Sequence, residues 1–365
     1  MCIAGLPPGG GERQFVTMVE GFLEAGCEIR IHVFISASKV FYKEIMDGTV
    51  PITFSNADRM GKIAAGITIL RDLRHICSEF NPDIVFGMLF TASCMVRIAR
   101  MLGLTNAAVV STIRTDYYKL YSTKLKMIEW LLRPFAAAVV SNHYKTYRGM
   151  VDRNIRNTHY IPNGLSPDHP AVARRAENGR FNILNIGQMK FRYKNQLSLL
   201  KAVEKLRKNG TVFTCTFIGQ GEDKARLEHE TVELGLEQFV AVIPPVHDVW
   251  DYYSKADVVV HYSIMEGCPN VLLEAMLAGL PVICSAYLGE MDIVADGENG
   301  LVSCDNSDEG LYKKLKEFEM LDDTQRYRLG NNARRTVMAK FSKNTMIGEY
   351  LELFNKTKKR SHENG

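Results

Sequence analysis

The sequence lacks any apolar run long enough to cross a bilayer, and no secretory signal segment opens it. It also lacks a C-x-x-C pair among its eight cysteines, and a chain of 365 residues is too long to depend on a disulfide scaffold. We therefore expect reduced thiols and a cytoplasmic protein, with the inner face of the cell membrane as the alternative location.

The sequence also lacks a concentrated run of like charges and any spacing of residues typical of metal ligands. The net charge of +4 is spread along the chain, so nucleic acid is not an expected partner. His261 lies on an apolar segment with no second His, Cys or carboxylate at ligand spacing. This favours a histidine of the core or of a cleft edge over a metal ligand, and we expect no metal.

What the sequence does contain is short apolar runs that alternate with longer amphipathic segments, in a chain that is 46% apolar and 24% charged. This alternation predicts an α/β fold with two doubly wound parallel sheets, each covered by helices on both faces. We expect ten strands, within residues 1–6, 28–36, 83–90, 107–113, 136–142, 181–187, 213–219, 239–245, 257–263 and 280–286.

A boundary is expected in residues 161–180, which hold three prolines and two glycines without an apolar period. We divide the chain into a first Rossmann-like domain of residues 1–168, a second of residues 169–345, and a C-terminal helix and tail of residues 346–365 that packs back toward the first domain. Ligands of such folds bind beyond the carboxyl ends of the strands, so we expect a cleft between the two domains.

Each half has a glycine turn after its first strand. Gly10 and Gly11 precede a helix that is expected from about Glu12, and such a turn lets backbone approach a phosphate or a sugar. The alternative is an ordinary strand-to-helix turn.

The second turn begins at Gly187 and carries Lys190, Arg192 and Lys194. Three cations in five residues form a candidate anion clamp, and a solvated basic loop is the alternative.

Two glutamates, Glu266 and Glu274, flank the start of an expected helix that has Pro269 at its first position and Gly267 or Cys268 as its cap. This helix is apolar on nearly every side, so a carboxylate on it needs a partner. An anion at the helix N-terminus with hydroxyl groups on either side fits the layout, as does a diphosphate between a ribose and a hexose. A buried Arg or Lys that pairs with Glu274 is the alternative.

With its flanks, this stretch resembles the family 4 glycosyltransferases of the GT-B fold. Glu266 and Glu274 match the E-x7-E element of that family. The segments "GQGEDKARLEHETVELGLEQFVAVI", "EAMLAGLPVICS" and "DIVADGENGLV" in the second half match its order and spacing, as do "GGGERQFVTMVEGFLEAGCEIRIHV" and "YIPNGLSPD" in the first.

The resemblance implies retaining, metal-independent transfer of a hexose or N-acetylhexosamine from a UDP-linked donor to a glycan or lipid-linked acceptor, in surface polysaccharide biosynthesis. It implies no cofactor, an acceptor-binding first domain and a donor-binding second domain. Among the implied contacts, Glu266 binds the transferred sugar, Glu274 binds the ribose, and Val246 meets the base. The phosphates are bound by Gly187, Arg192 and Lys194. The sugar and diphosphate also meet the amides of Gly267, Cys268, Asn270 and Val271, and the first domain approaches the donor with Gly10 and Gly11.

Two positions depart from the family pattern. Gln188 replaces the arginine that commonly follows the glycine of the second turn, so Arg192 or Lys190 is expected to supply that charge. No histidine follows the fourth strand of the first half, where Arg114 and Asp116 stand instead. We expect Arg114 to act as a catalytic group that neutralises the leaving phosphate, and a surface pair is the alternative. Asp116 is either an acceptor contact or, as we favour, part of a surface pair.

Residues 117–135 mix lysines with Tyr, Leu, Met and Trp. They predict either a basic amphipathic helix that contacts an anionic membrane, or a helix with one core face and one solvated face, which we favour.

Two other functions stay open. The chain could be another GT-B enzyme, such as a nucleotide-sugar epimerase, which would convert the donor without an acceptor. It could also be a non-catalytic partner in a glycan assembly complex, which would bind a nucleotide-sugar and never consume it.

Overall fold

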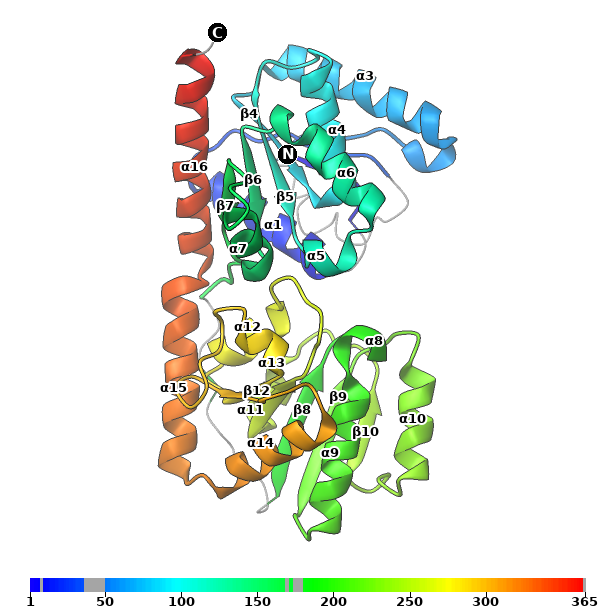
Figure 1. The fold of residues 1–365 in the computed structure, drawn as a ribbon, viewed down its shortest axis with the longest axis vertical. Helices are drawn as coiled ribbons and strands as arrows, with labels where there is room; N and C mark the ends of the chain where they lie inside the picture. Colours follow the sequence, from blue (N-terminus) through cyan, green and yellow to red (C-terminus); the bar gives the residue numbers. More distant parts are fainter. Residues whose placement is uncertain (7–8, 36–49, 168–170, 173–179, 364–365) are drawn as a thin grey trace. The chain divides into compact units, whose positions relative to one another are not determined.

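The computed structural model describes residues 1–6, 9–35, 50–167, 171–172 and 180–363. The chain divides into two compact units, Met1–Gly164 with Lys343–Gly365, and Leu165–Ser342 (Figure 1). The boundary expected between residues 168 and 169 lies outside the described residues. The C-terminal helix α16 (Lys343–Glu363) begins earlier than the expected residue 346, directly after Ser342, which pairs with Leu165 of the second unit.

The first domain contains a parallel sheet in the order β3-β2-β1-β4-β5-β6-β7. Its strands are β1 (Cys2–Ile3), β2 (Ile31–Val33), β3 (Ile52–Phe54), β4 (Ile84–Met88), β5 (Ala108–Ile113), β6 (Ala138–Ser141) and β7 (Thr158–Tyr160). Its helices, besides α16, are α1 (Gly10–Glu24), η1 (Ala57–Arg59), α3 (Lys62–Phe80), α4 (Leu89–Met101), α5 (Tyr117–Leu120), α6 (Thr123–Leu132), η2 (Arg133–Phe135) and α7 (Tyr144–Val151).

Side chains alternate along the strands of this sheet, so each face carries apolar residues and each face is covered by helices. Ile3 of β1 points into the core beneath α1 and α16, where Tyr350 packs edge-on against Phe22 at 6.0 Å between ring centroids. Cys2 points into the opposite core, beneath α3 and α4, together with Leu73.

The second domain contains a parallel sheet in the order β10-β9-β8-β11-β12-β13. Its strands are β8 (Phe181–Ile186), β9 (Phe213–Ile218), β10 (Val240–Ile243), β11 (Val258–His261), β12 (Val282–Cys284) and β13 (Leu301–Val302). Its helices are α8 (Phe191–Lys194), α9 (Gln196–Lys208), α10 (Lys224–Glu233), α11 (Trp250–Lys255), α12 (Asn270–Leu277), α13 (Ala286–Gly289), α14 (Asp308–Met320) and α15 (Asp323–Lys340).

The predicted α/β class with two parallel sheets is confirmed, and each of the ten expected segments contains a strand. Three strands were not predicted, namely β3, β7 and β13. They have two or three residues and lie at the ends of the two sheets, where pairing on one side does not require a continuous apolar run.

The eight cysteines are all free, as expected. Cys2, Cys94, Cys215, Cys268 and Cys284 are buried, Cys27 and Cys77 are half-buried, and Cys304 is exposed. Burial raises the pKa of the Cys2 and Cys94 thiols to about 11.

An ion pair is buried within the first domain, between α4 and α6. The guanidinium of Arg97 is fully buried and its Nη1 lies 2.6 Å from Oε2 of Glu129, whose other carboxylate oxygen accepts from Arg133 at 3.1 Å. Arg97 also donates from Nε to Ser111 Oγ at 2.9 Å. Since both charges are removed from water, each depends on the other.

We predict that Glu129→Ala lowers the free energy of unfolding by about 3–5 kcal/mol, because it leaves the buried charge of Arg97 without its carboxylate. Urea unfolding followed by circular dichroism measures the change. As a matched control, Glu228→Ala removes the exposed partner of Lys224 on α10 and should cost at most about 0.5 kcal/mol. Equal effects of the two variants would contradict the prediction.

Candidate active site

Glu266 lies at the carboxyl edge of the second sheet, in the turn between β11 and α12, and three side chains converge on its Oε1 atom. His261 Nε2 is 3.0 Å away, Ser263 Oγ donates at 3.0 Å, and Lys194 Nζ forms an ion pair with the same oxygen. Only 14% of the Glu266 side chain is exposed. The cluster joins β11 to the basic turn that ends in α8.

The electrostatics of this cluster favour an ionised carboxylate. Burial alone would raise the pKa of Glu266, but the charge of Lys194 and the hydrogen bond from His261 outweigh it and hold the pKa well below its usual range. Burial lowers the pKa of His261, against the opposing effect of Glu266. Glu266 is therefore a hydrogen-bond acceptor at neutral pH, not a proton donor.

Helix α12 starts at Asn270, with Pro269 as its N-cap. We expected Pro269 at the first helical position, so the helix begins one residue later than predicted. Pro269 has extended φ and ψ angles of −77° and 106°, which place it outside the helix. Pro269 O accepts from Leu272 N and Leu273 N at the start of the helix. The N-terminus of α12 therefore directly follows the turn that contains Glu266.

The second glutamate, Glu274, is half-buried on α12. Its Oε2 atom lies 3.5 Å from the hydroxyl of Tyr253, which is also 3.5 Å from Val271 O. Tyr253 comes from α11 and is fully buried. The contact with Tyr253 adds a neutral donor to the two partners considered from the sequence, a buried cation and a ligand, and both of those stay predictions.

Sequence reasoning missed the residues that hold the Glu266 turn. The Tyr287 hydroxyl donates to Glu266 O at 3.1 Å, and Ser285 Oγ donates to Ser263 O. His261 was interpreted only as a core or cleft-edge residue. The alternation of His261 and Ser263 at the end of an apolar strand places both on one side of the chain, and this signal could have linked them to Glu266.

The basic turn of the second domain brings one of its three cations to the cluster. Gly187 has a φ of +151°, a conformation that favours glycine, and Lys190 is the N-cap of α8. Lys194 reaches Glu266, whereas Arg192 is exposed and lies over the ring of Tyr193 at 5.5 Å.

The other predicted donor-binding residues lie near the same edge of the sheet or on the loops that leave it. Val246 follows β10 and is half-buried. Gly267 is half-buried and Cys268 is buried before α12, while Asn270 and Val271 form its first two positions and are half-buried.

In the first domain, α1 begins at Gly10 with Gly9 as its N-cap. A Cβ atom on Gly11 would lie 3.2 Å from Leu89 Cδ2, so the turn packs closely against the start of α4. Leu89 itself has a φ of +66°, which is uncommon for a non-glycine residue and strained.

Arg114 follows β5 at the carboxyl edge of the first sheet. It donates from Nη2 to Oδ1 of Asn163, and Asn142 Nδ2 donates to the same oxygen at 2.9 Å. Burial raises the pKa of Glu12, and the nearby charge of Arg114 opposes this shift. Asn142, Asn163 and Glu12 were not selected from the sequence.

Asp116 is not part of a surface pair, contrary to our preferred interpretation. It is 4% exposed and caps α5, where its Oδ1 accepts from Tyr118 N and Lys119 N at 3.1 Å. His143 Nε2 lies 4.0 Å from its carboxylate. Its role is to hold the turn after β5 in place.

Within the described residues, no group of three or more His, Cys, Asp or Glu side chains could hold a metal ion. In the same part of the chain, no helix combines the length and apolar character needed to cross a membrane.

Solved structures with the same architecture identify the fold class. The chain matches HepE from Anabaena in complex with UDP and glucose with a TM-score of 0.81 at 17% identity, over 98% of this chain and 100% of that one. It also matches the apo form of WaaB, a lipopolysaccharide outer core galactosyltransferase, with a TM-score of 0.77 at 18% identity, over 98% and 99% of the two chains. The fold is therefore GT-B.

Family comparisons identify the class of enzyme. "Glycosyltransferase Family 4" matches residues 8–169 and "Glycosyl transferases group 1" matches residues 172–336. Together these matches take in nearly the whole chain, which belongs to the family 4 glycosyltransferases, so the family named by the resemblance is confirmed. The assignment of Glu266 and Glu274 to the E-x7-E element stays a prediction.

Two curated relatives are similar over nearly their full length. One, from Campylobacter jejuni, is named GalNAc-alpha-(1->4)-GalNAc-alpha-(1->3)-diNAcBac-PP-undecaprenol alpha-1,4-N-acetyl-D-galactosaminyltransferase; it is 29% identical over 348 residues, 91% of each chain. The other is the lipopolysaccharide core biosynthesis glycosyltransferase LpsD of Rhizobium meliloti, 24% identical over 354 residues, 95% of each chain.

We predict that ionised Glu266 stabilises the second domain above its unfolded pKa of about 4.3, and that this contribution is lost as the pH falls through that value toward the lower folded pKa. The melting temperature of Glu266→Gln should therefore lie below that of the wild type at pH 7, and the gap should narrow progressively as the pH falls below about 4. Thermal unfolding at pH 7, 5 and 3.5 measures the gap.

The control for this series is Glu298→Gln, which neutralises an exposed carboxylate of the same domain. A gap between Glu266→Gln and the wild type that is as large at pH 3.5 as at pH 7 would mean that the charge of Glu266 is not what stabilises the turn.

Proposed function

We propose that this glycosyltransferase moves a hexose or N-acetylhexosamine from a UDP-linked donor to a lipid-linked glycan, with retention of the anomeric configuration and without a metal ion, in surface polysaccharide biosynthesis. The observation that carries the proposal is the ionised Glu266, held by Lys194, His261 and Ser263 beside the N-terminus of α12.

The donor site rests on the second domain. The first turn of α12 offers backbone N–H groups and the positive end of a helix to a diphosphate. Lys194 supports it with an ammonium group, which has three N–H donors and can bind a phosphate oxygen while one donor stays on Glu266. Glu274, on the same helix, would accept hydrogen bonds from the ribose hydroxyls.

Glu266 is proposed to position the transferred sugar. An ionised carboxylate accepts hydrogen bonds from sugar hydroxyls but has no proton to give to a leaving group. The three contacts on its Oε1 atom also reduce its strength as a nucleophile. The departing phosphate is therefore the better candidate for taking the proton of the acceptor, on the face of the sugar that it leaves.

Cations of the chain would replace a metal ion in this reaction. Breaking the anomeric C–O bond builds negative charge on the phosphate, and Lys194 together with the N-terminus of α12 would stabilise that charge. Arg114 is proposed as a further catalytic cation, supplied by the first domain. Its hydrogen bond to Asn163 would fix the direction of its guanidinium.

A lipid-linked acceptor is favoured by one relative and by one surface. The relative from C. jejuni is named for an undecaprenol-linked substrate. On α6, Met127, Trp130 and Leu131 are 54%, 71% and 53% exposed. The spacing of these three residues puts them on one side of the helix. Lys124, three residues before Met127, lies on the same side, so the face suits contact with an anionic membrane.

We predict that one UDP-sugar is consumed only when lipid extract is added, in a panel of UDP-, GDP- and ADP-sugars. Glu274→Ala and Glu266→Gln should each lower kcat/KM about 10- to 100-fold, because each removes a charged hydrogen-bond acceptor of the donor. Chelation with EDTA should leave the rate unchanged. Proton NMR of the product measures the anomeric configuration, which should equal that of the donor.

Glu222→Gln serves as the control for these variants, because it neutralises an exposed glutamate of the same domain. Conversion of the donor without an acceptor would favour an epimerase instead. Tight binding of a UDP-sugar that no mixture consumes would favour a non-catalytic partner.

We predict that Trp130→Ala and Leu131→Ala weaken binding to vesicles that contain phosphatidylglycerol, since they remove exposed apolar area from α6. Co-sedimentation measures the bound fraction. Met320→Ala, which removes an 82% exposed side chain from α14 of the second domain, should not change it. Equal losses for all three variants, or binding that does not depend on phosphatidylglycerol, would count against the membrane contact.

A further inference from the structure

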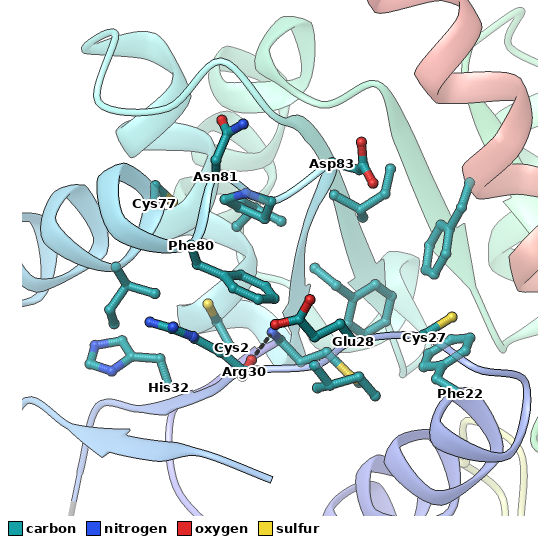
Figure 2. A pocket seen from close by; sticks show the side chains of 18 of the residues that line it. Cys2, Phe22, Cys27, Glu28, Arg30, His32, Cys77, Phe80, Asn81 and Asp83 are labelled. Atoms are coloured by element: carbon teal, nitrogen blue, oxygen red, sulfur yellow. Dashed lines mark hydrogen bonds between the residues drawn. The ribbon is translucent and has the colours of Figure 1, made fainter.

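A cavity of about 410 Å³ in the first domain lies at the amino ends of its strands, where Figure 2 shows Phe22 and Phe80 among the side chains around it. Ligands of doubly wound sheets bind at the opposite edge, beyond the carboxyl ends of the strands. In the second domain that edge carries the Glu266 turn, and a loop that follows β13 at the same edge, residues 303–307, is connected to it. The loop, and not the cavity, therefore belongs to the surroundings of the candidate active site.

The hydroxyl of the buried Tyr262 anchors this loop. It lies 2.8 Å from Ser303 Oγ and 2.9 Å from two backbone oxygens of the loop. The two neighbours of Tyr262 in the sequence are His261 and Ser263, whose side chains contact Glu266 instead. The end of β11 therefore holds the Glu266 turn with two side chains and the loop with the side chain between them.

Asn306 is exposed on this loop and makes two contacts that lead back to the ion pair of the site. Its Oδ1 atom accepts from Tyr287 N at 3.3 Å, and the hydroxyl of the same tyrosine donates to Glu266 O at 3.1 Å. Its backbone oxygen accepts from Nδ2 of Asn195 at 3.3 Å, and Asn195 directly follows Lys194. One residue is therefore linked to both partners of the ion pair.

Both links are themselves held in place. Tyr287 is buried, and its hydroxyl also accepts from Glu266 N at 3.4 Å. On the other side, Ser198 Oγ donates to Asn195 Oδ1 at 2.9 Å, which leaves the Nδ2 of the same amide for the loop. Asn195 has a φ of +54°, a conformation that asparagine adopts more readily than most residues. The loop thus acts on the backbone of the two turns, whereas His261 and Ser263 act on the carboxylate.

We propose that Asn306 is a positioning residue, which acts through Tyr287 to fix the backbone of Glu266 and through Asn195 to hold the turn of Lys194 beside it. The inference rests on the proposed function, in which Glu266 binds the transferred sugar. Asn306 then sets the rate of transfer without touching the substrate, because a small displacement of a positioning group is costly to the reaction. UDP lacks the transferred sugar, so the binding of UDP does not depend on Asn306.

The test compares variants of the full chain. Asn306→Ala removes the acceptor of Tyr287 N, whereas Asn306→Asp keeps an oxygen at that position. Tyr287→Phe removes the hydroxyl that contacts Glu266 O. Asn332→Ala is the matched control, since it removes a single hydrogen bond of 3.0 Å from a side-chain amide to Glu298 O in the same domain.

The first measurement uses no substrate. Nε2 of His261 lies 3.0 Å from Glu266 Oε1, so its nitrogen NMR signal reports on that contact. Asn306→Ala and Tyr287→Phe should shift the signal, while Asn306→Asp and Asn332→Ala should leave it in place. An unchanged signal in Asn306→Ala would overturn the proposal. If no donor of the panel described above is consumed, the proposed function fails, and the His261 signal alone decides whether Asn306 positions Glu266.

The second measurement uses the donor and acceptor that the panel identifies. Asn306→Ala should lower kcat about 3- to 10-fold, as expected for one hydrogen bond, while the Kd of UDP from calorimetry stays within about twofold of the wild type. Asn306→Asp should recover most of the rate. Because Asn306 acts through Tyr287, the double variant should be no slower than Tyr287→Phe alone. Additive losses in the two variants, or a loss of UDP affinity as large as the loss of kcat, would overturn the proposal.

Discussion

The ion pair between Lys194 and Glu266 is the interaction on which the rest of the second domain depends. It connects the turn after β8 to the turn after β11, which are neighbours in the second sheet. Because His261 and Ser263 contact the same oxygen, one carboxylate fixes the ends of two strands at once. A buried carboxylate is costly to ionise unless its hydrogen-bond donors stay in place. The contacts from Lys194, His261 and Ser263 therefore hold one another in a single arrangement around Glu266.

Hydrogen bonds from two tyrosines support the two glutamates of the candidate site. The hydroxyl of Tyr287 donates to the backbone oxygen of Glu266, and the hydroxyl of Tyr253 contacts the carboxylate of Glu274. In the first domain, Asn163 holds Arg114 in a similar manner. In each case a neutral hydrogen-bonding side chain positions a charged one, as precise binding of a substrate requires.

The sequence was most informative where strands are buried on both faces and where charged residues interrupt apolar segments. The ten predicted strands and the positions of Glu266, Glu274 and Lys194 could be read from such patterns. The partners of these residues could not, because Tyr287 and Tyr253 come from elements that are remote along the chain and have no motif of their own. Asp116 was misjudged for a related reason, since a carboxylate that caps a short helix looks like any surface charge until its burial is known.

The distribution of the cysteines has a practical consequence for spectroscopy. Cys304 follows β13 at the carboxyl edge of the second sheet, in a loop whose Asp305 O accepts from the Tyr262 hydroxyl at 2.9 Å. Two residues after Cys304, Asn306 Oδ1 accepts from the backbone N of Tyr287 at 3.3 Å, and the hydroxyl of the same tyrosine donates to Glu266 O. The thiols of Cys215 and Cys284 are buried and hold their protons far above neutral pH. A maleimide dye would thus react first at Cys304 and place a fluorophore on the second domain without any engineered site.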